Sequence, residues 1–334
     1  MGDWPAVTCL CPTYGRFERL RDAVACFLLQ DYPGAKDLVI VNDAPWPVGL
    51  GPEHGAWECQ RRDGVTLLNE AKRYENLGEK RQHLLEMAGG PAALVAHWDD
   101  DDLYLPWHLS MLVERLQAAQ GESPERNRRV SCVKPGAAWW AVGPRDAFQV
   151  RGIRHNVFEG QMLFRRDRAR ELGGYPAKNS GQARDLLRAF DRAGEAEVWN
   201  PPDHDVSYVY RWGDGVDHVS ARCTAGGVAR DRDFGDGRPL IPDEDAATWA
   251  KDRLRGQFRQ LVAGCAAHLD REGRDAFTAR LRAAVACDLT PYATNSSEPI
   301  ATSAEVKTAA LPKRSFQCRM PRTNAAIWQA RKNR

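Results

Sequence analysis

The stretch that decides the fold is His97-Trp98-Asp99-Asp100-Asp101-Asp102-Leu103-Tyr104-Leu105-Pro106, in which four consecutive carboxylates follow an apolar run. That run, residues 92–96, predicts a buried strand, and a helical pattern begins after Pro106. Like charges packed this closely repel each other, so they need either water, as in a solvated acidic turn, or a cation. At the end of a buried strand we favour the cation, and such oxygen ligands suit Mg²⁺ or Mn²⁺.

Two more strands are expected before this stretch, over residues 6–12 and 37–41, with a helical pattern over 17–30 between them. This β-α-β order predicts a parallel pair joined by a right-handed crossover. Ligands of such sheets gather beyond the carboxyl ends of the strands. Thr13, Asp43 and the Asp99 cluster each follow a predicted strand, so we expect them to share one crevice.

The remaining apolar patterns predict an α/β chain with a helical end. Strands are expected over 65–68, 130–133, 137–142, 157–164 and 206–212, and helices over 76–87, 109–119, 166–172, 181–193 and within 249–287. Residues 226–245 are rich in Gly, Asp and Arg and predict a flexible or lid-like segment.

Composition places the chain among soluble globular proteins. A hydrophobic fraction of 43% is ordinary, and a formal net charge of +2 gives no general argument for nucleic-acid or membrane binding. No apolar run approaches the ~20 residues of a membrane span, and the N-terminus lacks the pattern of a signal peptide. Nine cysteines without metal-ligand spacing indicate reduced thiols. We therefore expect a cytoplasmic protein, either free or peripheral at the membrane.

Over roughly residues 5–220, the chain resembles the family 2 glycosyltransferases, the large inverting group with a GT-A fold. Residues 7–33 are similar to the family's opening strand, Pro-Thr-Tyr turn and helix, and residues 38–45 to its second strand. The strongest match is WDDDDLYLPWHL, which resembles the family's Asp-x-Asp-Asp motif. On that register Asp99 and Asp101 form the DxD pair, and Asp102 is the third carboxylate.

The chain also departs from the family's pattern. Asn42 replaces the first Asp of the usual Asp-Asp pair after the second strand, so Asp43 alone carries over. In the segment NLGEKRQHLLEMAGG, Gly78 and Arg81 match, whereas Gln82 stands where Asn is usual. Arg184 replaces the Glu that normally precedes the catalytic base, which leaves Asp185 in the position of that base.

The resemblance implies a GT-A fold, that is, a Rossmann-like, mainly parallel sheet flanked by helices, here with a helical C-terminal extension. We expect a glycosyltransferase domain over 1–224, with a nucleotide-sugar-binding half over 1–105 and an acceptor-side half over 106–224. A loop and helical extension would follow over 225–290, and a basic, flexible tail over 291–334. Residues 307–334 hold eight Lys or Arg and no Asp or Glu.

The implied function is metal-dependent, inverting transfer of a sugar from a nucleotide-sugar, with UDP favoured, to an acceptor hydroxyl. Negative charge that builds on the leaving diphosphate needs a Mn²⁺ or Mg²⁺ ion held by hard oxygen ligands. The implied metal ligands are Asp99, Asp101 and His218. Asp100 would point the other way if the strand continued, exposed to solvent. The residues implied to bind the donor are Thr13, Tyr14, Arg16, Asp43, Gly78, Arg81, Asp99, Asp100 and Arg211.

Inversion in one displacement needs a general base on the acceptor hydroxyl. The resemblance implies Asp185 for that role, with Glu159 in reserve. Each assignment has a structural alternative: Asp185 as a helix-start acid and Asp43 as a turn acid. Arg81 and Arg211 would otherwise be surface residues, and Trp107, Trp139 and Trp140 either stack on rings or fill the core.

Two other classes of function stay open. Clustered Asp also serves a metal-dependent nucleotidyltransferase or phosphohydrolase. The other class is a nucleic-acid-binding or scaffold protein whose glycosyltransferase-like domain is inactive. The basic tail would suit such a role, because it could contact nucleic acid or another anionic surface. The acceptor is undefined at this stage and could be a glycan, a lipid-linked glycan, a protein or a nucleic acid.

Overall fold

The computed structural model describes residues 4–51, 59–89, 94–121, 129–156, 158–212, 237–242 and 245–285. All of them belong to one compact unit, Met1–Pro291. The boundaries expected at residues 105 and 224 stay predictions. In the ranges just given, no helix combines the length and the hydropathy that a membrane span needs.

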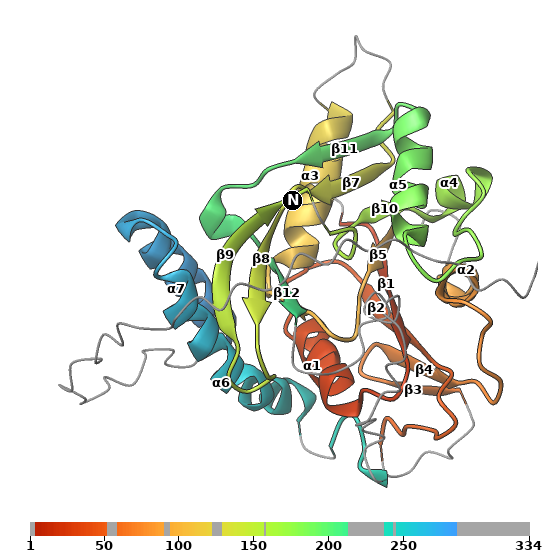
Figure 1. Cartoon of the computed structure of the whole chain (residues 1–334), viewed down its shortest axis with the longest axis horizontal. Coiled ribbons are helices and arrows are strands. Elements are labelled where there is room, and N and C mark those ends of the chain that lie inside the picture. Colours follow the sequence, from red (N-terminus) through yellow and green to blue (C-terminus); the bar gives the residue numbers. More distant parts are fainter. Residues whose placement is uncertain are drawn as a thin grey trace, which may run out of the picture. The chain divides into compact units, whose positions relative to one another are not determined.

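Within the described residues, the larger sheet has eight strands in the order β11-β7-β10-β5-β1-β2-β4-β3 (Figure 1). The strands are β1 (Val7–Thr13), β2 (Lys36–Asn42), β3 (Gln60–Arg62), β4 (Val65–Asn69), β5 (Leu94–His97), β7 (Cys132–Pro135), β10 (Leu163–Arg165) and β11 (Ala196–Trp199). The four adjacent strands β5, β1, β2 and β4 are parallel, and β10 runs antiparallel to β5. The mainly parallel α/β architecture expected from the sequence is thereby confirmed.

Helices cover both faces of this sheet because its strands are apolar on both sides. Cys9 and Cys11 of β1 pack in the core that includes α1 (Phe17–Leu28) and α3 (His108–Gly121). Leu10, which points the other way, packs in the core of α2 (Leu77–Met87), α4 (Arg166–Glu171) and α5 (Gln182–Arg192). The alternation along one strand therefore fixes which helices lie on which side.

A second, four-stranded sheet has the order β6-β12-β8-β9. Its strands are β6 (Leu103–Tyr104), β12 (Tyr208–Trp212), β8 (Ala137–Val142) and β9 (Gln149–His155), and the short helix η1 spans Asp203–Asp205. The C-terminal helices α6 (Ala246–Cys265) and α7 (Arg271–Val285) pack along β9 and η1 (Figure 1). The helical extension expected after the sheet is therefore present.

A buried carboxylate ties α6 to the rest of the unit. Asp22 of α1 is fully buried and accepts hydrogen bonds from Arg145, Arg211 and Arg253, at 2.7, 3.1 and 2.8 Å. The pKa of Asp22 lies below its ordinary value, because the three guanidinium groups outweigh the effect of burial. One carboxylate thus joins α1, β12, α6 and the β8–β9 turn.

Two sequence-based boundaries were wrong. The strand predicted over 157–164 is confined to Leu163–Arg165, because Phe158–Met162 forms a turn in which Gly160 packs against other side chains. The strand β9 was missed because its residues are mostly exposed and lack an apolar alternation. The segment 226–245 lies largely outside the described residues.

Candidate active site

The run of four aspartates forms a loop at the carboxyl end of β5, which we call the carboxylate loop (Asp99–Asp102). The side chains of Asp99 and Asp101 are 23% and 11% exposed. Asp100 and Asp102 are buried, at 0% and 1% exposure. The expectation that Asp100 would be exposed is wrong, because β5 ends at His97 and the loop turns that side chain toward β1.

Arg16 neutralises two members of this loop. Its Nη1 donates to Asp101 Oδ2 at 2.6 Å, and its Nε donates to Asp100 Oδ2 at 3.1 Å. Thr13 Oγ1 adds a hydrogen bond of 2.6 Å to the same oxygen of Asp100. Burial raises the pKa of Asp100 above its ordinary value, while the Arg16 charge opposes the shift. Arg16, in the turn after β1, therefore holds the carboxylate loop in place through its positive charge.

Arg81 neutralises Asp99 in the same way. Its Nη2 donates a hydrogen bond of 2.5 Å to Asp99 Oδ1. His97 lies beside Arg81, and its Nδ1 donates to the Glu159 carbonyl at 2.7 Å while Nε2 accepts from the Tyr175 hydroxyl. Burial lowers the pKa of His97 well below its ordinary value, with a further contribution from Arg81. A neutral imidazole is thus part of the support for the Arg81–Asp99 pair.

Asp102 is held from the second sheet. Its Oδ1 accepts from the Arg211 backbone amide at 3.0 Å, and its Oδ2 accepts from the Tyr208 hydroxyl. Burial raises the pKa of Asp102 to about 8, and the charges of Asp101 and Asp99 add to the shift. The Arg211 guanidinium points into the interior, where Nε donates to the Asp101 carbonyl at 2.8 Å. Contact with a donor phosphate would require it to leave this buried position.

A cavity of about 290 Å³, the Asp43 cavity, lies between the turn after β1 and the start of α2. Asp43 Oδ1 pairs with Lys80 Nζ at 2.5 Å, and its Oδ2 accepts from the Tyr74 amide at 3.1 Å. The Arg73 guanidinium stacks 4.3 Å from the centre of the Tyr14 ring. The cavity is lined by Pro12, Thr13, Tyr14, Arg16, Asp43, Arg73, Tyr74, Glu75, Asn76, Leu77, Lys80 and Asn179.

An adjoining cavity of about 530 Å³, the Asp101 cavity, contains three of the four loop aspartates. Its walls also include Glu159, Asp185 and Lys178, together with Phe158 and Tyr210. The two cavities share Pro12, Arg16, Leu77 and Asn179. The structure thus brings Asp99 and Asp101, the expected base Asp185 and the expected donor-binding turn to two adjoining cavities.

The two candidate bases sit at the edge of the Asp101 cavity. Asp185, in the first turn of α5, is 39% exposed on its side chain and pairs with Lys178, which lowers its pKa below the ordinary value. Glu159 pairs with Arg184 at 3.1 Å between Oε1 and Nε. Both carboxylates are therefore held in ion pairs that are partly open to water, which weakens the attraction between the charges.

Two glycines are needed for close packing around this site. A Cβ on Gly78 would lie 1.9 Å from the Pro176 carbonyl oxygen, so this residue lets α2 approach the 176–178 segment. A Cβ on Gly160 would lie 2.6 Å from the Tyr208 hydroxyl and 2.8 Å from Asp99 Oδ2. The structure gives Gly78 a packing role, in addition to the donor-side role implied by the resemblance.

Carboxylate oxygens of Asp99 and Asp101 are the ligands that suit a divalent cation here. Among the described residues, no group of three or more His, Cys, Asp or Glu side chains is placed to hold a metal. Mg²⁺ is often bound by one or two carboxylates with substrate phosphates completing its coordination, and this donor set fits that pattern. His218, the third expected ligand, lies outside the described residues.

Sequence reasoning missed several residues of the site. Lys80 is 5% exposed and bridges Asp43 to the Thr13 carbonyl, and only its place beside Arg81 on a predicted helix pointed to it. Tyr208 and Lys178 contact site carboxylates, but no sequence signal paired them.

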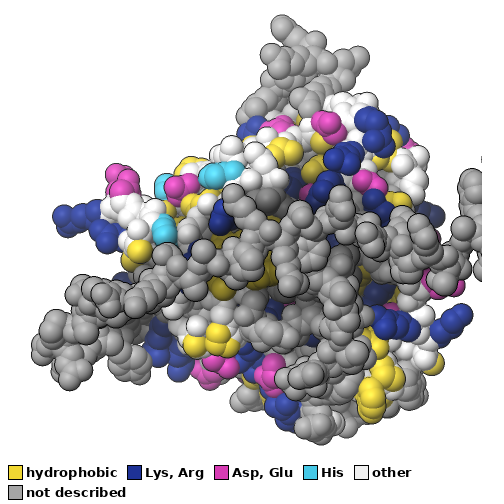
Figure 2. Space-filling model, in the orientation of Figure 1, with side chains coloured by type: hydrophobic (Ala, Val, Ile, Leu, Met, Phe, Trp, Pro, Cys, Tyr) yellow, Lys and Arg dark blue, Asp and Glu magenta, His cyan; other side chains and the backbone are white. Residues whose placement is uncertain are grey.

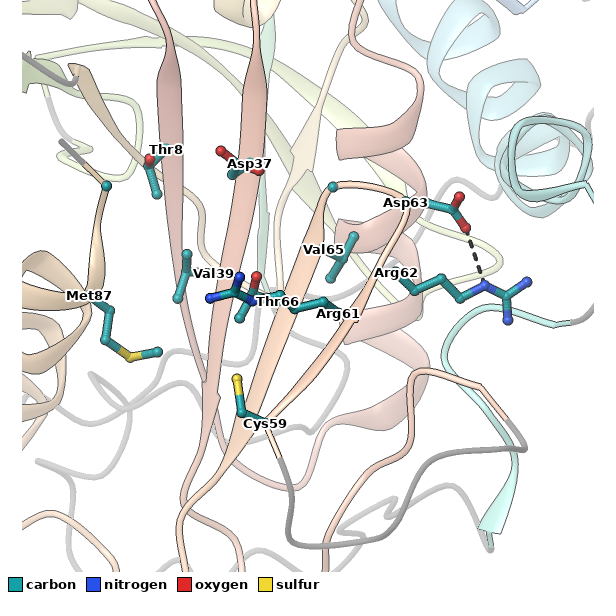
Figure 3. Close-up of a pocket in the computed structure, with 12 residues that line it drawn as sticks. Thr8, Asp37, Val39, Cys59, Arg61, Arg62, Asp63, Val65, Thr66 and Met87 are labelled. Atoms are coloured by element: carbon teal, nitrogen blue, oxygen red, sulfur yellow. Dashed lines mark hydrogen bonds and ion pairs between the residues drawn. The ribbon is translucent and has the colours of Figure 1, made fainter.

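A third cavity, of about 470 Å³, lies where β1, β2 and β4 begin, and we call it the Arg61 cavity (Figure 3). Thr8, Asp37 and Val39 line it from the sheet and Met87 from α2, while the Arg62–Asp63 pair points away from the other lining residues (Figure 3). In parallel α/β sheets ligands bind at the opposite, carboxyl end of the strands. We therefore use Arg61 as a control position.

Residues 8–172 match the model of the family described as Glycosyl transferase family 2. No curated protein matches the chain. Among solved structures, S. aureus TarS 1–349 in complex with UDP-GlcNAc is 13% identical and has a TM-score of 0.43, covering 83% of this chain and 80% of that chain. The mannosyltransferase PcManGT from Pyrobaculum calidifontis, in complex with GDP-Man and Mn²⁺, is 17% identical with a TM-score of 0.36, covering 84% and 73%.

The glucosyl-3-phosphoglycerate synthase of M. tuberculosis is 13% identical, with a TM-score of 0.36 over 80% of this chain and 82% of that chain. Because these TM-scores are all below 0.5, the assignment to a family rests on the match of residues 8–172 to the family model. The matched segment contains β1 from Thr8 onward, α1, β2 and the whole carboxylate loop. The chain belongs to glycosyltransferase family 2, and it is a glycosyltransferase.

Proposed function

We propose that the enzyme transfers a sugar from a nucleotide-sugar, with UDP favoured, to an acceptor hydroxyl with inversion and with the help of Mn²⁺ or Mg²⁺. The observation that carries this proposal is the shared Asp101 cavity, in which Asp99 and Asp101 lie with the candidate base Asp185. Inverting transfer needs this combination, because metal ligands and base act on the two partners of one displacement.

The nucleobase would occupy the Asp43 cavity. Tyr14 and Arg73 offer a stacking surface, and the Asp43 carboxylate is an acceptor for a ring N–H, as in uracil. Lys80, 2.5 Å from Asp43 Oδ1, holds that carboxylate in place at the cavity wall. Arg16 lines both cavities, so a donor that fills both would pass its diphosphate beside this guanidinium.

Asp99 and Asp101 would hold the cation, because their side chains are the more exposed members of the carboxylate loop. A bound Mn²⁺ or Mg²⁺ would stabilise negative charge on the diphosphate as the bond to the sugar breaks. Arg81 and Arg16, which pair with these carboxylates, would offset the remaining negative charge of the loop. Asp102, which is 1% exposed and accepts hydrogen bonds from the Tyr208 hydroxyl and the Arg211 amide, would support the loop rather than bind the ion.

Asp185 would accept the proton of the acceptor hydroxyl. The acceptor oxygen then forms a bond to the anomeric carbon, and the electron pair of the breaking glycosidic bond leaves on the diphosphate. Lys178 lowers the pKa of Asp185, so the carboxylate is ionised in the neutral range. Glu159, on the same cavity wall, is the reserve base.

A cytoplasmic location, and a contact of the basic tail with an anionic surface or nucleic acid, remain predictions.

The test is release of nucleoside diphosphate from a panel of UDP-, GDP- and dTDP-sugars, with Mn²⁺, with Mg²⁺ and with EDTA. We expect one base to be preferred and EDTA to abolish turnover. Proton NMR of the first product should show the anomeric configuration opposite to that of the donor. Release of phosphate or pyrophosphate from nucleotides without a sugar would instead favour the phosphohydrolase or nucleotidyltransferase, and activity that survives EDTA would contradict metal dependence.

A further inference from the structure

One face of the second sheet carries aromatic side chains that begin at the carboxylate loop. Because side chains of a strand alternate, Tyr208, Tyr210 and Trp212 of β12 share a face, while Val209 and Arg211 point into the interior. In the ladder, Tyr210 lies opposite Trp140 of β8, which places the Trp140 side chain on the same face.

The rings on this face lie nearly parallel. Phe158 stacks on Tyr210 with centroids 4.0 Å apart and planes 16° from parallel. Trp140 lies 5.6 Å from Tyr210 at 27°, and Trp212 lies 6.3 Å from Tyr210 at 20°. We call these four residues, Trp140, Phe158, Tyr210 and Trp212, the aromatic face.

The aromatic face is continuous with the Asp101 cavity. Phe158 and Tyr210 line that cavity together with Asp101 and Asp185. Tyr208, the first residue of the same strand face, donates its hydroxyl to Asp102. A molecule that extends from the candidate base along β12 would therefore pass over these rings.

These rings differ from the tryptophans that fill the core. Trp98, Trp107 and Trp139 are fully buried, at 0% exposure. All four members of the aromatic face are half-buried, so each keeps part of its surface accessible, and two of them, Phe158 and Tyr210, line the polar Asp101 cavity. Aromatic side chains with a few polar groups around them are typical of ligand-binding surfaces.

The chemistry of the surroundings favours a sugar as the ligand. A pyranose ring presents C–H groups on its face, which suit the negative face of an aromatic ring, and hydroxyls at its edge. Glu159, Arg184 and Asp185, at the near end of the aromatic face, offer both acceptors and donors to such hydroxyls. On the molecular face drawn in Figure 2, described Lys and Arg side chains are interspersed with Asp and Glu.

We propose that the aromatic face is the acceptor subsite and that the acceptor is a carbohydrate, whose sugar ring stacks on Tyr210 and Trp140. This inference rests on the proposed function and adds the class of acceptor to it. Arg154 adds a cation–π contact to the aromatic face, because its guanidinium lies over the Trp140 ring, 5.4 Å from the ring centre. Specificity for the acceptor is thereby placed on the second sheet, away from the donor-binding turn.

The experiment uses the full chain with its preferred donor and Mn²⁺. The probes are gluco-, galacto-, manno- and N-acetylglucosamine oligosaccharides of two to six sugars, examined by saturation-transfer NMR and as acceptors. We expect saturable binding of one series. In Trp140→Ala and Phe158→Ala the acceptor KM should rise at least tenfold, and by a much larger factor than the KM for the donor.

Conservative and distant variants separate binding from folding. Trp140→Phe should restore most of the acceptor affinity because it keeps an aromatic ring, and Arg61→Ala, at the other end of the sheet, should match wild type. Unchanged acceptor KM in both alanine variants would overturn the inference. So would the absence of binding by every oligosaccharide, or transfer to hydroxylated DNA or a peptide instead. If the wild-type enzyme hydrolyses no nucleotide-sugar donor at all, that result would contradict the proposed function itself.

Discussion

The carboxylate loop and the start of α5 both bring carboxylates to the Asp101 cavity, but they are held in different ways. Asp100 and Asp102 are buried, and each is bonded to a partner from another element. At the start of α5, the side chains of Asp185 and Arg188 are 39% and 63% exposed. Surface ion pairs contribute little to stability, whereas buried charges depend strongly on their partners. The loop is thus fixed in advance, and the acceptor side can adjust to its ligand.

The largest effect is expected in the loop. Asp101→Asn keeps the side-chain shape but removes the charge that would hold the cation, so kcat/KM should fall at least about 10³-fold. Steady-state kinetics over a range of Mn²⁺ concentrations measures the loss. Arg61→Ala is the matched control and should retain wild-type activity. A fall of less than tenfold in Asp101→Asn would remove this residue from the proposed mechanism.

Removing the carboxylate that joins α1, β12 and α6 should produce the next largest effect. Asp22→Asn leaves Arg145, Arg211 and Arg253 without their shared buried counter-charge. The free energy of unfolding should fall by about 3–5 kcal/mol, as measured by urea denaturation. An unchanged midpoint would show that the three arginines do not depend on this carboxylate.

The same residue has a pH signature. Because the folded-state pKa of Asp22 lies below its ordinary value of 3.8, the folded protein binds fewer protons at this site than the unfolded protein does. Its stabilising contribution is present above 3.8 and is lost as the pH falls through the folded-state pKa. The acid-side fall in melting temperature should therefore be shallower in Asp22→Asn than in wild type, provided that both unfold reversibly.

On the acceptor side, Asp185→Asn should lower kcat by about 10²–10³-fold, because it removes the general base. Binding of UDP should stay at the wild-type level, since Asp185 does not line the Asp43 cavity. Equilibrium binding of UDP with Mn²⁺ checks this separation. If Glu159→Gln is the more damaging substitution, the roles of the two carboxylates are reversed.

The smallest effect concerns the pH dependence of the base. Lys178 lowers the pKa of Asp185, so Lys178→Met should move the acidic limb of the kcat/KM profile to higher pH. The plateau rate should change little, because the pair is exposed and screened. An acidic limb that does not move would indicate that another group controls it.

Much of the fold follows from local patterns in the sequence. The apolar runs of β1, β2 and β5 and the spacing of α1 predict a parallel core, and the four aspartates predict a polar loop at its carboxyl edge. The partners of those aspartates could not be predicted. Arg16 meets Asp100 across 84 residues and Arg253 meets Asp22 across 231, and such pairs depend on how distant elements pack.

Two residues show this limit most clearly. Gly78 matched a family motif, yet its place is explained by the Pro176 carbonyl that a side chain would strike. Arg211 matched a segment expected to reach the donor, but Asp22 and the Asp101 carbonyl hold its guanidinium inside. Sequence spacing identified the right elements, whereas the direction of each side chain required the tertiary structure.

The most direct test of the central claim is the melting temperature of wild type and Asp101→Asn with UDP, with and without Mn²⁺. A ligand at a hundred times its dissociation constant stabilises the folded state by about 2.7 kcal/mol, which corresponds to a rise of a few degrees. We predict that rise for wild type only when UDP and Mn²⁺ are both present, and its loss in Asp101→Asn. An equal rise in the variant, or none with any nucleoside diphosphate, would contradict the carboxylate loop as the metal and donor site.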